Sequence, residues 1–82
     1  MLFTQIFLHK ISFPSFLNLS KNDALENLYL NGNKLTSIDL SNNKNLLVLN
    51  VNNNKLENLD LSNNTKITDL KANDNAFSLK SD

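Results

Sequence analysis

The sequence predicts a β-rich solenoid of about three turns, and two internal periods carry this prediction. Laid over itself with a shift of 21 residues, the stretch 25–67 matches nearly column for column, with Leu25, Leu46 and Ile67 in one apolar column. Inside each 21-residue unit the apolar residues recur after 10 and then 11 residues, so each turn has two similar halves. A fixed period of this length is typical of repeats that stack on their neighbours along one axis.

The spacing inside each half predicts strands. The pattern is L-x-x-L-x-L, whose last three positions alternate inward and outward as in a strand. A helix would need a period of 3.6 residues, and Asn-rich runs interrupt every candidate. Strands of the first halves are expected around 27–31, 48–52 and 69–73, and strands of the second halves around 16–20, 37–41 and 58–62.

The repeats divide the chain into a short first segment and a longer second one. Segment 1–16 is apolar but is broken by polar residues, and it lacks a positive n-region and a clear cleavage site. We expect it to cap the core, with a degenerate targeting signal or sequence outside the repeats as alternatives. The repeats are expected over 17–82, as partial unit 17–24, units 25–45 and 46–66, and partial unit 67–82.

The apolar columns define the expected core. Its members share the inward positions of the repeated pattern. They are Leu17, Leu19, Leu25, Leu28, Leu30, Leu35, Ile38, Leu40, Leu46, Leu49, Val51, Leu56, Leu59, Leu61, Ile67, Leu70 and Phe77.

Composition excludes several classes of function. Eight Lys balance eight acidic residues in a chain of 82, so no basic field favours nucleic acid or an anionic membrane surface. The apolar stretch near the N-terminus falls short of the ~20 residues that span a bilayer, so membrane insertion is not expected. The chain has no Cys and hence neither a disulfide framework nor a thiolate metal site.

The motif L-x-x-L-x-L-x-x-N occurs three times in register. It occurs as LENLYLNGN at 25–33, as LLVLNVNNN at 46–54 and, weakened, as ITDLKANDN at 67–75. It resembles the signature of the leucine-rich repeat family. The resemblance covers residues 17 to about 78.

The second halves sharpen this resemblance. LTSIDLSNN at 35–43 and LENLDLSNN at 56–64 are similar to the short bacterial subclass with nested 21-residue repeats, sometimes called the IRREKO type. That subclass implies a right-handed coil of the horseshoe superfamily without regular outer helices. It also implies a role in protein recognition, at a bacterial surface or in a secreted or effector protein.

The last unit departs from the pattern. Ala72 stands in a core column of larger residues, and Leu79 falls one residue before the column of Ile38 and Leu59. The chain is therefore expected to be either a fragment of a longer array or a minimal array with an exposed sheet edge, which favours strand pairing.

Asparagine forms the most regular polar feature of the sequence. Two columns repeat at the 21-residue period, and each amide is expected to turn inward and bond backbone groups of neighbouring turns. The first column is Asn33, Asn54 and Asn75, and the second is Asn22, Asn43 and Asn64.

Outward positions of the first-half strands form the expected partner surface. Tyr29 is the aromatic residue of this face, and Tyr is enriched among residues that dominate binding energy. Tyr29, Asn50 and Lys71 form its central stripe, with an ordinary solvated face as the alternative. The expected partner-binding residues are Tyr29, Asn31, Val48, Asn50, Asn52 and Lys71.

Chemistry-bearing residues form no catalytic pattern. Asp39 and Asp60 stack one repeat apart on an exposed face, where both are expected to be ionised, and Asp74 lacks the further carboxylates of a calcium loop. His9 is the single histidine. The sequence therefore predicts a non-enzymatic protein-binding module without cofactor or metal. The alternative is a structural fragment of a longer surface or effector repeat protein with no independent activity.

Overall fold

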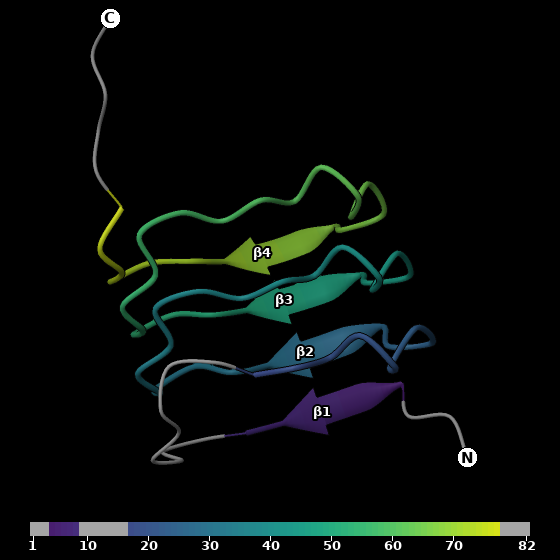
Figure 1. Cartoon of the computed structure of the whole chain (residues 1–82), viewed down its shortest axis with the longest axis horizontal. Helices are drawn as coiled ribbons and strands as arrows, with labels where there is room; N and C mark the ends of the chain where they lie inside the picture. Colours follow the sequence, from purple (N-terminus) through teal and green to yellow (C-terminus); the bar gives the residue numbers. More distant parts are fainter. Residues whose placement is uncertain (1–3, 9–16, 78–82) are drawn as a thin grey trace, which may run out of the picture.

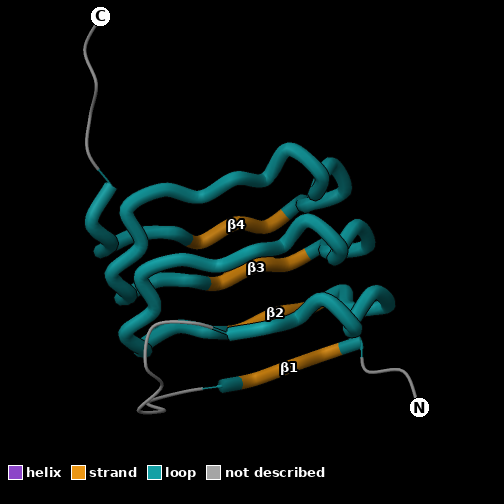
Figure 2. The backbone as a smooth tube through the Cα atoms, viewed as in Figure 1, coloured by secondary structure: helices purple, strands orange, loops and turns teal. Residues whose placement is uncertain are grey.

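The computed structural model describes residues 4–8 and 17–77. They contain one sheet of four strands, β1 (Gln5–Phe7), β2 (Asn27–Tyr29), β3 (Val48–Asn50) and β4 (Asp69–Lys71). Neighbouring strands are parallel, and their spatial order follows the chain (Figure 1). The described residues include no helix (Figure 2).

Successive circuits build the sheet, a circuit being one strand with the segment that returns to the start of the next strand (Figure 2). Leu28 lies opposite Leu49, and Leu49 lies opposite Leu70, which is the 21-residue period of the sequence. The repeat therefore sets the register, because each of these circuits has the same length. Four parallel strands in one sheet, with no helix in the described residues, are consistent with the expected β-rich solenoid.

Strands β2, β3 and β4 start where the sequence predicts but end two residues earlier. Each is followed by a residue with left-handed backbone, Gly32 at φ 77°, Asn53 at φ 59° and Asp74 at φ 59°. Gly, Asn and Asp enter this region most readily. These three residues occupy equivalent positions of successive circuits and turn the chain out of the sheet.

Strand β1 was not predicted from the repeat pattern. It pairs with β2 so that Gln5 lies opposite Asn27, one residue more than the 21-residue period. Ile6 and Leu8 have the same alternation as Leu28 and Leu30, but the extra residue shifts them out of the compared columns. Segment 1–16 was expected to cap the core, and residues 4–8 of it add a strand to the sheet. Residues 1–3 and 9–16 lie outside the described part.

The second-half strands were predicted wrongly, since 17–20, 37–41 and 58–62 contain no strand. Asp39 Oδ1 accepts the N–H of Ser41 at 2.9 Å, and Asp60 Oδ1 accepts the N–H of Ser62 at 2.9 Å. Such local bonds compete with a ladder between strands. The back of each circuit is therefore not organised as a second sheet.

The core lies between the sheet and the return segments. Ten members of the expected core are buried, namely Leu19, Leu25, Leu28, Leu30, Leu35, Leu40, Leu46, Leu49, Val51 and Leu56. Partly buried side chains that pack against them include Leu17, Ile38, Leu59, Leu61 and Ile67.

Two members of the expected core are exposed instead. Leu70 is 45% exposed and Phe77 is 42% exposed. Both belong to the circuit of β4, and β4 pairs with β3 alone among the described strands. Leu49, which has a circuit on either side, is fully buried.

Candidate functional site

The front face is the outward side of the sheet. Side chains alternate along each strand, and the central residue of β2 and of β3 is buried, so the flanking residues point outward. The parallel register arranges these residues in two rows. The Tyr29 row is Phe7, Tyr29, Asn50 and Lys71, and the Val48 row is Gln5, Asn27, Val48 and Asp69.

An aromatic pair begins the Tyr29 row. The rings of Phe7 and Tyr29 are stacked, with centroids 4.4 Å apart and planes 3° from parallel. Phe7 is 65% exposed, whereas Tyr29 is half-buried. Phe7 was not among the expected partner residues, because only an offset of 22 residues aligns it with Tyr29.

An ion pair lies at the other end of the front face, on strand β4. Lys71 Nζ lies 3.5 Å from Asp69 Oδ1, and both side chains are about half exposed. Exposed pairs of this kind contribute little to stability. Their effect here is to join the two rows and to leave this end of the face without net charge.

Two amides of the expected partner surface, those of Asn50 and Asn52, accept hydrogen bonds from the backbone. Asn50 Oδ1 accepts the N–H of Asn52 at 3.0 Å, and Asn52 Oδ1 accepts the N–H of Asn73 at 2.7 Å. Their acceptor oxygens therefore hold the backbone beyond the strand ends.

The structure brings together four of the six expected partner residues on the front face. Tyr29, Asn50 and Lys71 lie in one row, and Val48 lies in the adjacent row. The remaining two, Asn31 and Asn52, lie beyond the ends of β2 and β3, where they are partly buried.

The first asparagine column bonds both to its own circuit and to the circuit before it. Asn54 Nδ2 donates to Leu30 O at 2.9 Å and to Val51 O at 3.0 Å, and Asn54 Oδ1 accepts the N–H of Leu35 at 3.1 Å. Asn33 donates similarly to Leu8 O and Leu30 O, and Asn75 to Val51 O and Ala72 O.

The second column bonds differently. Asn64 Nδ2 donates to Leu40 O at 3.0 Å and Asn43 O at 2.8 Å, and Asn43 Nδ2 donates to Leu19 O and Asn22 O. The Oδ1 atoms of Asn43 and Asn64 are buried and receive no hydrogen bond from the described residues. Asn22 takes part through its backbone carbonyl.

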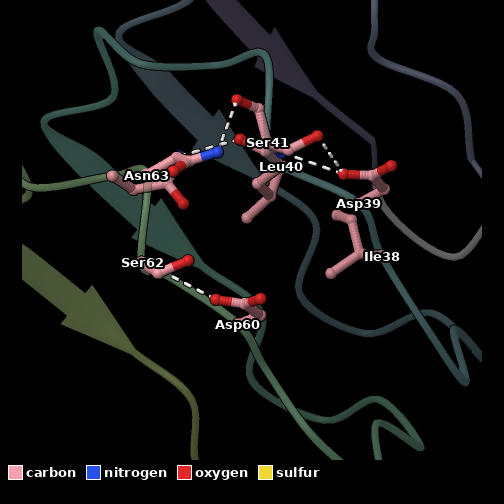
Figure 3. A pocket seen from close by; sticks show the side chains of 8 residues that line it. Ile38, Asp39, Leu40, Ser41, Asp60, Ser62 and Asn63 are labelled. Atoms are coloured by element: carbon pink, nitrogen blue, oxygen red, sulfur yellow. Dashed lines mark hydrogen bonds between the residues drawn. The ribbon is translucent and has the colours of Figure 1, made fainter.

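A hollow of about 230 Å³ lies on the back of the molecule (Figure 3). Asp39, Ser41, Asp60, Ser62 and Asn63 contribute its polar lining. Figure 3 shows each aspartate directed toward the serine two residues later.

These contacts favour the ionised form of the two carboxylates. The Ser41 hydroxyl, at 2.6 Å, and the Ser41 N–H lower the pKa of Asp39 below its ordinary value, against smaller opposing effects of desolvation and of the Asp60 charge. The Ser62 hydroxyl and N–H likewise lower the pKa of Asp60. A general acid needs the opposite shift, so the geometry of this hollow favours an ordinary charged surface.

Over residues 4–8 and 17–77, no group of three or more His, Cys, Asp or Glu side chains could hold a metal ion. In the same part of the chain, no helix has the length and apolar character needed to cross a bilayer.

No protein-family model, no curated protein and no solved structure matches the chain.

Proposed function

We propose that the chain is a non-enzymatic protein-binding module, a solenoid of the leucine-rich repeat type whose front face contacts a protein partner. The parallel register at a 21-residue period and the repeated L-x-x-L-x-L-x-x-N motif support this assignment. The contact is centred on the Tyr29 row and includes the expected residues Asn31, Val48 and Asn52 around it.

The observation that carries the proposal is the stacked pair of Phe7 and Tyr29. An exposed aromatic ring that is already held against a second ring offers a large apolar area at a low cost in side-chain entropy. Tyr also brings a hydroxyl for a hydrogen bond, and this combination is common among the residues that dominate binding energy.

The rest of the face supports recognition by shape and hydrogen bonding. Asn27, Asn50 and Gln5 present neutral amides, and the charges of Asp69 and Lys71 are paired with each other. A face without net charge does not steer a strongly charged partner. The surface of the proposed partner protein is therefore mixed in character, with an apolar patch that contacts Phe7 and Tyr29.

A site-specific crosslink tests the proposal. A photo-crosslinking amino acid at Asn50 should capture one protein from the cell of origin, whereas the same group at exposed Asn58, on the back, should not. Once that protein is identified, Tyr29→Ala should weaken its binding by about 2 kcal/mol or more, roughly 30-fold.

Two results oppose the proposal. One is equal capture from Asn50 and Asn58, and the other is an affinity that Tyr29→Ala leaves unchanged while circular dichroism reports an intact fold. Asn58→Ala is the matched control, because it also shortens a side chain to alanine but lies away from the front face.

A further inference from the structure

The two outer strands of the sheet carry backbone groups directed away from it. On β1, Thr4 O accepts the N–H of Asn27 and Leu8 N donates to Tyr29 O, each at 2.9 Å. Pairing in a parallel strand alternates from one neighbour to the other along the chain. The N–H and C=O groups of Gln5 and Phe7 therefore point outward, and no strand of the described sheet pairs with them.

On β4 the outward groups belong to Leu70. Asp69 N donates to Leu47 O at 3.2 Å, and Lys71 O accepts the N–H of Val51 at 2.8 Å, so these two residues bond toward β3. The N–H and C=O of Leu70 point to the opposite side. Among the described strands, none lies on that side of β4.

The two edges are complementary to each other. Inside the sheet, Leu28 lies opposite Leu49. The backbone N–H and C=O of Leu28 point toward β3 and bond the residues that flank Leu49. Leu70 opposite Ile6 of another molecule would repeat this arrangement, with Gln5 and Phe7 as the flanking residues. The same parallel geometry would then continue across the junction.

We propose that a second copy of this chain pairs with the outer strands of the sheet, so that β1 of one molecule pairs in parallel with β4 of another. This inference goes beyond the front-face function and does not depend on it. Because β1 and β4 are different surfaces, the contact is heterologous, and it extends into open, head-to-tail assemblies rather than closing as a symmetric dimer.

Side chains at the junction favour this register. Leu70, 45% exposed in the single molecule, would be covered by the partly buried Ile6. In the outward row, Lys71 would come beside Phe7, whose other ring face already stacks on Tyr29. An ammonium group over an exposed aromatic ring is a favourable contact.

Single-cysteine variants of the whole chain test the pairing, since the natural sequence has no cysteine. Gln5→Cys and Asp69→Cys would be neighbours across the junction, as Val48 and Asp69 are within one molecule. A short thiol-specific cross-linker should give several-fold more dimer in a mixture of the two variants than in either variant alone. The double variant Val48→Cys/Asp69→Cys shows that the reagent spans neighbouring strands.

A charge introduced at the junction should prevent the pairing and with it the cross-linking. Leu70→Lys in the Asp69→Cys variant should abolish the mixed dimer, and it should leave the circular dichroism spectrum intact because this side chain is already half exposed. The proposal is overturned if the mixture gives no more cross-linked dimer than the single variants. This is the result expected if another part of the same chain covered β4. It is also overturned if each single variant alone gives as much dimer as the mixture, because like edges would then pair. Front-face binding is measured separately through Tyr29→Ala, so the two proposals fail independently.

Discussion

Asp39 and Ser41 illustrate how one local contact sets both the backbone path and the ionisation of a side chain. The carboxylate accepts two hydrogen bonds from Ser41, so the N–H of that residue is not available to a neighbouring strand. The same bonds favour the charged form of Asp39. The sequence shows the repeated Asp-Leu-Ser triplet, but its alternation of apolar and polar residues resembles a strand, and this is why strands were predicted there.

The first prediction concerns the pKa of Asp39. Ser41→Ala removes the hydroxyl, which is the largest cause of the lowered pKa, so the pKa of Asp39 should rise toward its ordinary value. Carboxyl chemical shifts followed by NMR during a pH titration measure this directly. Asp60→Asn is the control with the opposite sign, because it removes a nearby negative charge and should lower the pKa of Asp39 further.

The pH dependence of stability should reflect the lowered pKa of Asp39. A carboxyl with a lowered folded pKa stabilises the native state above its unfolded pKa of about 3.9, and this contribution is lost as the pH falls through the lower folded value. The melting temperature should therefore fall between pH 5 and pH 3 less steeply in Ser41→Ala than in the natural chain. A steeper fall in the variant would contradict the assignment. Both groups are exposed, so the difference will be small.

The two asparagine columns should differ in their importance to stability. Asn54→Ala leaves the buried N–H of Leu35 without its acceptor, whereas Leu30 O and Val51 O keep their bonds from Asn33 and Asn75. A buried group left unsatisfied costs about 1–3 kcal/mol. Asn64→Ala removes donors only, because the Asn64 oxygen accepts no bond from the described residues.

Urea unfolding should therefore rank Asn54→Ala as more destabilising than Asn64→Ala. Exposed Asn58→Ala should change the free energy of unfolding by less than about 0.5 kcal/mol. Equal losses of unfolding free energy in Asn54→Ala and Asn64→Ala would mean that the hydrogen bond from the Leu35 N–H to Asn54 Oδ1 contributes nothing to stability.

At the scale of the strand, position within the sheet decides how much a side chain contributes. Leu49 and Leu70 occupy the same column and differ by one circuit, yet Leu49 is fully buried and Leu70 is 45% exposed. The repeat pattern assigned both to the core, because a column in the sequence does not record whether a circuit lies on each side. The prediction for Leu70 was wrong for this reason.

The same substitution at the two positions tests this difference. Leu49→Ala should cost about 2–5 kcal/mol through lost burial and a new cavity. Leu70→Ala should cost clearly less, because nearly half of that side chain is in water already. Thermal unfolding of the pair measures the difference, and equal losses would indicate that Leu70 is covered in solution.

At the scale of the whole molecule, the regular features of the sequence were the predictable ones. The register of β2, β3 and β4 followed from the 21-residue period, and the buried leucines followed from the inward positions. Strand β1 broke the period by one residue, and with it Phe7 was lost from the expected partner face. Half of the central aromatic pair therefore could not be found from the repeat.

The direction of the asparagine bonds has a consequence for synthesis. Asn43, Asn54 and Asn64 donate to carbonyls 21 to 24 residues earlier in the chain, on the circuit before their own. A circuit that has just left the ribosome therefore lacks these additional hydrogen bonds until the next circuit follows it. Each part of the nascent chain is completed by a later part, so order should spread from the older end one circuit behind translation.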